Sequence, residues 1–186
     1  MTRKDKIHVL SRAVIVDQGH ILLCKTLDLP KAFYFLPGGH IEHGESAKEA
    51  VLRELQEEAK VKECKIKRVL DCLEYSFEPG HNSICHNHEY NFIFEVTSPS
   101  LKKQIPIARL KDHIELFWFP LDQLSTIDFR PEPLQNLLKK WLDEPSLQNL
   151  ESVMILVFPI TPFISFAMAK QIGTKNTEPW DKLIFP

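Results

Sequence analysis

Three glutamates, Glu54, Glu57 and Glu58, fall within one short stretch of the chain and could together hold a divalent metal. In a helix, offsets of three and four residues bring side chains together on one face. No Lys or Arg lies three or four residues after Glu54, so we expect the like charges to repel unless a cation joins them. Mg²⁺ suits such a site because it takes hard oxygen ligands and also coordinates phosphates. A solvated acidic face is the alternative that the charge run alone leaves open.

This spacing matters only if the glutamates lie on a helix, and the sequence predicts one that begins just after Ser46. Ser46 and Glu49, three residues apart, form a capping-box pair that satisfies free amide groups at a helix start. From Ala47 no Gly or Pro interrupts the chain until Pro79, and good helix formers dominate the first part of that stretch. The expected apolar face consists of Leu52, Leu55 and Ala59, with Val51 at its edge.

The residues before this helix favour a metal site over a solvated face. Gly38 and Gly39 end an aromatic run, residues 33–35, that is typical of a short buried strand. Glycine permits backbone angles closed to other residues, so carbonyl groups here can turn toward a ligand. A strand, a glycine turn, a loop with Gly44 and a capped helix together resemble a cradle for phosphate and metal.

The whole stretch resembles the box of the Nudix hydrolase family, G-x5-E-x7-R-E-U-x-E-E-x-G-U, where U is aliphatic. Lys60 stands where the family has its second glycine, a left-handed position after the helix. Lys can occupy that position at a cost of about 1 kcal/mol, so we expect a slightly altered helix exit. The surrounding pattern fits the family domain over about residues 5–144. The residues that match the box are Gly39, Glu45, Arg53, Glu54, Leu55, Glu57, Glu58 and Val61.

The resemblance implies an α/β fold, an α/β/α sandwich around a mixed β-sheet. It also implies a pyrophosphohydrolase that cleaves a nucleoside diphosphate linked to another group, with Mg²⁺ or Mn²⁺ as cofactor. Carried over to matching positions, Glu54, Glu57 and Glu58 would be metal ligands, with the Gly38 carbonyl completing the site. Glu54 would also activate the water that attacks a pyrophosphate phosphorus.

The same resemblance assigns roles to residues around the box. Glu45 and Arg53 would form an ion pair that ties the loop to the helix. Family members differ in where the general base lies, and a loop acid outside the box sometimes serves. Asp112 and Glu115, before the aromatic strand at residues 117–119, are the candidates here. Each could equally be an ordinary polar residue of a strand or loop.

Candidate substrate contacts lie near the glycine turn. His40 follows Gly38 and Gly39 close to the expected phosphate position, and Lys25 begins a loop, residues 25–32, on the substrate side. Tyr34 could stack on a base, although aromatic residues in strands usually belong to the core.

The sequence defines the substrate and the class of function less closely than it defines the family. The base-reading Asn of members that clean oxidised guanine nucleotides has no counterpart, and Pro79 lies too far beyond the box for the signature of members that act on ADP-ribose. A nucleotide-sensing module without turnover is the alternative to an enzyme. Because the chain keeps every acid of the box and shows no helix-turn-helix segment, we expect the enzyme.

Composition gives no sign of a nucleic-acid or membrane partner, so the expected partner is the nucleotide-derived small molecule that the resemblance implies. A formal net charge of −2 gives no electrostatic argument for binding nucleic acid or a membrane. No signal peptide is apparent, and the four cysteines show no C-x-x-C pairing, so a cytoplasmic location with reduced thiols is expected.

The remaining segments complete the expected layout, with residues 1–144 as the Nudix domain. Residues 145–186 form an extension of unknown role, in which a strand at 153–158 could pack on the domain or on a second subunit of a homodimer. Its apolar stretch, 153–169, is short for a membrane span and contains two prolines. The other expected elements are a hairpin of 7–16 and 20–25 joined at 17–19, strands at 66–77, 89–97 and 116–119, and a helix at 133–142.

Overall fold

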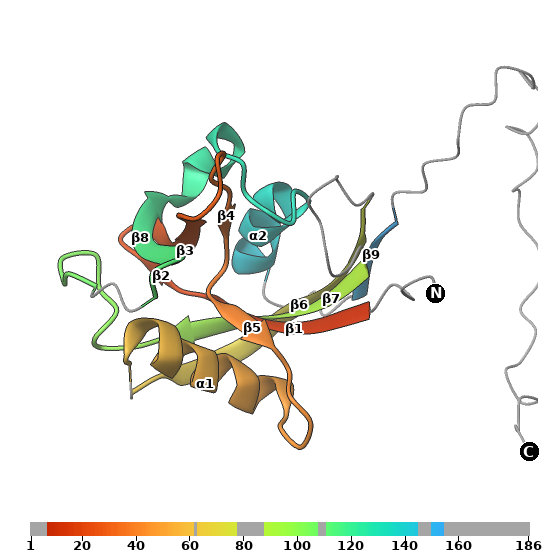
Figure 1. The fold of residues 1–186 in the computed structure, drawn as a ribbon, viewed down its shortest axis with the longest axis horizontal. Helices are drawn as coiled ribbons and strands as arrows, with labels where there is room; N and C mark the ends of the chain where they lie inside the picture. The colour runs from red at the N-terminus through yellow and green to blue at the C-terminus, as the bar shows by residue number, and fades with distance from the viewer. Residues whose placement is uncertain (1–6, 62, 78–87, 108–110, 145–149, 155–186) are drawn as a thin grey trace, which may run out of the picture. The chain divides into compact units, whose positions relative to one another are not determined.

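The computed structural model describes residues 7–61, 63–77, 88–107, 111–144 and 150–154, which form two β-sheets and their helices (Figure 1). The strands of the larger sheet, in order across it, are β5 (Gly38–His40), β1 (Ile7–Val14), β7 (His88–Thr97), β6 (Lys65–Ser76) and β9 (Leu150–Met154). Strand β1 is parallel to β7 and β9 is parallel to β6, whereas the β1–β5 and β6–β7 pairs are antiparallel. The larger sheet is therefore mixed, as expected. The strands of the smaller sheet are β2 (Val16–Asp17), β3 (His20–Thr26), β4 (Tyr34–Phe35) and β8 (Ile114–Pro120).

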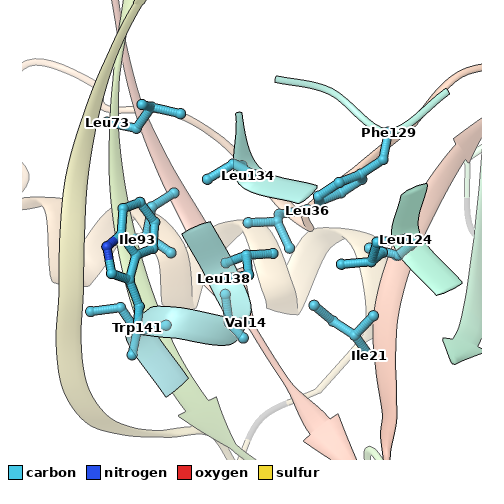
Figure 2. Packing of buried hydrophobic residues seen from close by; sticks show 12 residues of the cluster. Val14, Ile21, Leu36, Leu73, Ile93, Leu124, Phe129, Leu134, Leu138 and Trp141 are labelled. Atoms are coloured by element: carbon cyan, nitrogen blue, oxygen red, sulfur yellow. The ribbon is translucent and has the colours of Figure 1, made fainter. Parts of the chain in front are cut away.

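Helices α1 (Ala47–Ala59) and α2 (Leu134–Asp143) cover opposite faces of the sheets (Figure 1). Neighbouring residues of a strand point to opposite faces, so Ala13 and Val14 of β1 enter different clusters. Ala13 packs in the cluster of Val51 and Leu55 from α1, and Val14 in that of Leu134, Leu138 and Trp141 from α2 (Figure 2). The predicted α/β/α sandwich is confirmed. A short 3-10 helix, η1 (Leu121–Thr126), follows β8.

The predicted hairpin is only partly correct. The turn at Gln18 and Gly19 is present, and both residues have positive φ, but β1 ends at Val14 and belongs to the larger sheet. Only the two residues of β2 pair with β3. The chain passes between sheets at the buried Ile15, and because the apolar pattern continues across that point, the sequence does not reveal the switch.

Two local predictions around β3 and β4 were wrong. Lys25 and Thr26 continue β3 and are not part of a loop. The aromatic run before the glycine turn does form a short strand, β4, but its side chains are half-buried rather than buried. The strands expected at 66–77, 89–97 and 116–119 correspond to β6, β7 and β8, and the helix expected at 133–142 corresponds to α2.

The structure includes a strand beyond residue 144. Strand β9 pairs with β6 and overlaps the strand expected at 153–158 at its first two positions; residues 155–186 lie outside the described residues. The predicted homodimer contact falls largely on those residues and stays a prediction.

Both ends of α1 follow local sequence signals. The Ser46 hydroxyl accepts the Glu49 N–H at 3.2 Å, and the Glu49 carboxylate accepts the Ser46 N–H at 2.7 Å. At the other end Lys60 itself adopts the left-handed cap conformation, with φ 51° and ψ 29°, and donates its N–H to the Gln56 carbonyl. The predicted capping box is therefore confirmed, and Lys60 takes the conformation that a glycine would favour.

Candidate active site

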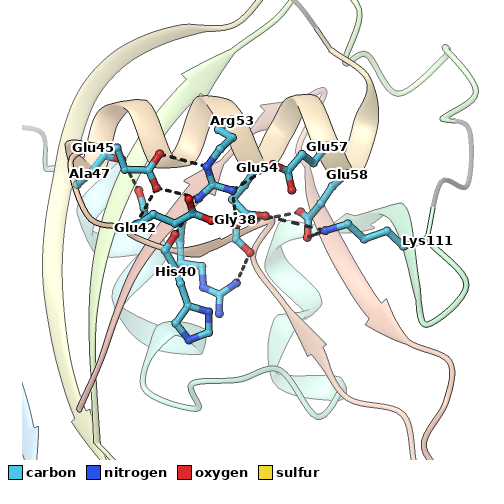
Figure 3. Close-up of polar contacts among 12 residues, drawn as sticks. Gly38, His40, Glu42, Glu45, Ala47, Arg53, Glu54, Glu57, Glu58 and Lys111 are labelled. Atoms are coloured by element: carbon cyan, nitrogen blue, oxygen red, sulfur yellow. Dashed lines mark hydrogen bonds and ion pairs between the residues drawn. The ribbon is translucent and has the colours of Figure 1, made fainter. Parts of the chain in front are cut away.

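The three box glutamates differ in exposure although one helix carries them all. The side chain of Glu58 is 4% exposed, whereas that of Glu57 is 50% exposed. Glu54 lies between these extremes and faces the turn at Gly38 and Gly39 (Figure 3). The buried face of α1 consists of Ala50, Val51, Leu55 and Glu58, with Leu52 and Ala59 only half-buried. The buried face of α1 is thus rotated about the helix axis from the predicted one, and it includes one acidic residue, Glu58.

The Glu58 carboxylate is buried among polar groups that donate hydrogen bonds to it. Its Oε2 accepts the backbone N–H of Gly38 at 3.1 Å and the thiol of Cys24 at 3.8 Å. Burial raises the pKa of Glu58, while Lys111 and the Gly38 N–H act in the opposite direction. Burial and the nearby Glu58 charge raise the pKa of Cys24 well above its usual value. The Glu58 carboxylate therefore lies where its negative charge needs a cation.

Each glycine of the turn is required for a different reason. Gly38 has φ +129°, and a Cβ there would overlap the backbone oxygen of Ser11 in β1. A Cβ on Gly39 would overlap the carboxylate of Glu54. The Gly38 carbonyl, a predicted metal ligand, accepts a hydrogen bond from Arg12 Nη1 at 2.8 Å. The turn thus brings the β5 backbone against both Glu54 and Glu58.

Arg53 joins the loop to the glutamates. It donates two hydrogen bonds to Glu45, at 2.8 and 3.1 Å, so the predicted ion pair is present. Its Nη1 also donates to Glu54 at 3.0 Å and Glu57 at 3.2 Å, and its Nη2 donates to the His40 carbonyl at 3.0 Å. The expectation that no helix cation relieves the glutamates was wrong, because it considered only residues that follow Glu54. Arg53 precedes Glu57 by four residues, a spacing that brings the two together.

The Glu45–Arg53 pair leads to a pH prediction. The hydrogen bonds from Arg53, followed by the Glu42 N–H, lower the pKa of Glu45 from its ordinary 4.5. A carboxyl whose pKa is lower in the folded protein stabilises the fold above pH 4.5 and loses that contribution as the pH falls through the folded value. We expect Glu45→Gln to lower the melting temperature at pH 6, and we expect this difference from the wild type to shrink as the pH falls below 4.5 through the lowered pKa of Glu45. Thermal unfolding of both proteins from pH 3 to 6 checks this, and a constant difference across the range would contradict it.

Lys111 is a site residue that the sequence did not predict. Its Nζ lies 3.6 Å from Glu58 Oε1 and 4.0 Å from Glu54 Oε2 (Figure 3). It comes from the segment before β8, far from the box in sequence, and only its position beside the candidate Asp112 could have drawn attention to it.

The donor set fits a hard divalent cation, although the side chains are arranged around cations of the chain itself. Over the described ranges, no three His, Cys, Asp or Glu side chains gather around one point. Arg53 and Lys111 bind the carboxylate oxygens instead. Three carboxylates on adjacent helical turns, beside a glycine turn that admits Glu54, are nonetheless ligands of the kind that Mg²⁺ prefers.

Comparison with known proteins identifies the family. The family model of the NUDIX domain matches residues 7–144. The chain belongs to the Nudix family. An ADP-ribose pyrophosphatase from Methanocaldococcus jannaschii is 30% identical over 129 residues, which cover 69% of this chain and 70% of that protein.

Two solved structures illustrate the shared fold. The MutT protein from Methanosarcina mazei Go1 has a TM-score of 0.58 at 19% identity, covering 78% of this chain and 100% of the other. An ADP-ribose pyrophosphatase from Streptococcus suis 89-1591 has a TM-score of 0.51 at 19% identity, covering 78% of this chain and 96% of the other. At this identity the likeness supports the Nudix fold and nothing further.

Family membership and the curated relative make this chain a pyrophosphohydrolase that cleaves acid anhydrides in phosphorus-containing compounds. Nudix hydrolases generally use divalent metals, in keeping with the carboxylates of α1. Within the part of the chain that the structure describes, no helix has the length and apolar character needed to cross a membrane.

The general base stays a prediction, and the strand register bears on the two candidates. Glu115 of β8 lies opposite Lys25 of β3, so their side chains share a face of the smaller sheet. Cys24, next in the strand and in contact with Glu58, points to the other face. The Glu115 side chain therefore leaves β8 on the face of the smaller sheet that points away from Glu58. Asp112 is exposed and directly follows Lys111, which lies beside Glu54 and Glu58, so Asp112 is a better candidate for the general base than Glu115.

The substrate contacts expected at Tyr34, His40 and Lys25 also stay predictions. Tyr34 is opposite Lys25 in register, and its ring packs edge-on against Phe117 with centroids 5.5 Å apart. His40 is exposed, and its Nε2 lies 2.7 Å from His8 Nδ1. Its backbone carbonyl accepts a hydrogen bond from Arg53, which also binds Glu54 and Glu57. Of the three residues, His40 is therefore linked most directly to the glutamates.

Proposed function

We propose that this protein is a Mg²⁺-dependent hydrolase of nucleoside diphosphate derivatives and that ADP-ribose is its substrate. The observation that carries the proposal is the complete set of box acids, held against the glycine turn by Gly38, Arg53 and Lys111. Similarity to an ADP-ribose pyrophosphatase supports the choice of substrate, although Pro79 lies farther beyond the box than the proline typical of members that act on ADP-ribose. One water molecule would be consumed as the P–O–P bridge breaks, and the products would be AMP and ribose 5-phosphate.

Glu54, Glu57 and Glu58 would hold the cation, with the second lone pair of the Gly38 carbonyl available to it. When bound, Mg²⁺ neutralises phosphate charge and lowers the pKa of coordinated water, and Mn²⁺ could do the same. Glu54 would accept the proton of the attacking water. Arg53 keeps Glu54 in place, and the missing side chain of Gly39 leaves space for its carboxylate.

The remaining residues would position the substrate. Gly38, Gly39 and His40 lie along β5, beside the helix that carries the glutamates, which favours contact with the phosphates. Tyr34 and Lys25 lie on β4 and β3, where they would contact the groups on either side of the pyrophosphate.

A substrate panel tests the proposal. Purified protein with Mg²⁺ would be given ADP-ribose, UDP-glucose, ATP and diadenosine tetraphosphate, and products would be separated by chromatography. We expect the highest kcat/KM for ADP-ribose, with AMP and ribose 5-phosphate in equal amounts and ¹⁸O from labelled water in one product phosphate. A tenfold preference for another compound would overturn the ADP-ribose assignment. Tight binding without hydrolysis of any compound would favour a nucleotide-binding module instead.

A further inference from the structure

Lys111 brings a positive charge to the box glutamates from outside α1. Its ammonium lies 3.6 Å from the Oε1 of Glu58 and 4.0 Å from the Oε2 of Glu54 (Figure 3). The Glu58 side chain is 4% exposed and that of Lys111 is 28% exposed. A buried carboxylate is strongly disfavoured unless a cation compensates it, and Lys111 reaches Glu58 from the more exposed side.

The two cations around the glutamates are held very differently. Arg53 is fixed by two hydrogen bonds to Glu45 and one to the His40 carbonyl, in addition to its bonds to Glu54 and Glu57. Lys111 lies at ion-pair distance from Glu54 and Glu58, through a flexible side chain that ends in a single point charge. Of the two side chains, that of Lys111 is the more flexible and carries the more compact charge.

The two carboxylate oxygens of Glu54 contact different cations. Its Oε1 accepts a hydrogen bond from Arg53, and its Oε2 faces Lys111. Lys111 therefore lies across Glu54 and Glu58, two of the three carboxylates that would hold a divalent cation. Positive charges about 4 Å apart repel, so the ammonium and a divalent cation compete for the same oxygens.

We propose that Lys111 is the internal countercation of this site. It compensates Glu54 and Glu58 when no metal is bound, and it moves to the phosphates of the nucleotide when a metal takes its place. This inference rests on the proposed metal-dependent function. It makes Lys111 a positioning residue that links two binding events, because the same ammonium opposes the metal and attracts the phosphate.

Linkage of this kind is reciprocal. If nucleotide phosphate draws Lys111 away from Glu58, nucleotide must tighten metal binding by the same factor that metal tightens nucleotide binding. A lysine that only supports the fold behaves differently, since its loss would loosen the glutamates and weaken metal binding.

Mn²⁺ binding by calorimetry tests the proposal without any turnover. We expect Lys111→Met to bind Mn²⁺ roughly tenfold more tightly than the wild type when nucleotide is absent, because the competing charge is gone. Lys111→Arg keeps the charge and should stay closer to the wild type. Lys139→Met, at an exposed position of α2, removes a lysine elsewhere and should leave Mn²⁺ affinity unchanged. Saturating AMP should tighten Mn²⁺ binding severalfold in the wild type and by a clearly smaller factor in Lys111→Met, where only direct coordination of the phosphate remains.

Equal or weaker Mn²⁺ binding by Lys111→Met than by the wild type would overturn the proposal, as would an unchanged effect of AMP. Lys111→Gln provides the same comparison should Lys111→Met not fold. Glu54→Gln separates this failure from that of the proposed function. If Glu54→Gln leaves Mn²⁺ affinity unchanged, the metal site itself is wrong. If it weakens Mn²⁺ binding and Lys111→Met has no effect, only the role of Lys111 is wrong.

Discussion

Replacement of Glu54 by Gln is expected to lower kcat for the hydrolysis of ADP-ribose with Mg²⁺ by roughly 10²–10⁴-fold. The amide has nearly the shape of the carboxylate, but it can neither accept the proton of the attacking water nor offer a charged ligand to the cation. The Glu54 oxygen that binds Arg53 has a counterpart in the Gln carbonyl, so the fold should be retained. Steady-state kinetics and thermal unfolding of the same preparation measure both effects.

Glu63→Gln is the matched control, because it makes the same chemical change at an exposed residue beyond the end of α1. It should keep wild-type kcat. If Glu54→Gln retained kcat within about threefold of Glu63→Gln, neither proton transfer nor metal binding could depend on Glu54.

A second large effect is expected for Gly38→Ala, which should destabilise the fold by about 3 kcal/mol or more. Gly38 has φ +129°, a conformation that side chains rarely adopt, and its Cβ would overlap the Ser11 carbonyl of the paired strand β1. That neighbour is backbone within a sheet and cannot move aside cheaply. Urea unfolding followed by circular dichroism gives the free energy of unfolding.

Two other glycines serve as controls for this prediction. Gly44 has φ +88° with open space around it, so Gly44→Ala should cost only about 1–2 kcal/mol. The nearest atoms to a Cβ on Gly39 belong to the Glu54 carboxylate, whose side chain can move, so Gly39→Ala should fold and yet lose activity. Equal stability of Gly38→Ala and Gly44→Ala would show that the close approach to Ser11 has little energetic weight.

The parts of the site that could be predicted from the sequence are those set by local spacing. The capping box at Ser46 and the Glu45–Arg53 ion pair connect residues that are close in the chain or joined by one helix and its loop. The left-handed cap after α1 could also be located, because its position in the box is defined, and Lys60 takes it.

The parts that could not be predicted depend on contacts between distant segments. Lys111 reaches the glutamates from the chain before β8, and Arg12 of β1 reaches the Gly38 carbonyl. Glu58 looks like any other charged residue of an acidic run, yet its burial depends on Gly38 and Cys24, which the fold brings against it. Helical periodicity alone cannot show such partners, so it placed the apolar face of α1 slightly off its true position.

The central claim is that the carboxylates of α1 hold a divalent cation on which anhydride cleavage depends. The most direct test is the rate of ADP-ribose hydrolysis by wild-type protein and Glu54→Gln, freed of metal with EDTA and then titrated with Mg²⁺. The account predicts negligible hydrolysis by the metal-free wild type, recovery that saturates with Mg²⁺, and little recovery by Glu54→Gln at the same Mg²⁺. Full activity of the metal-free wild type, or equal recovery by the two proteins, would contradict it.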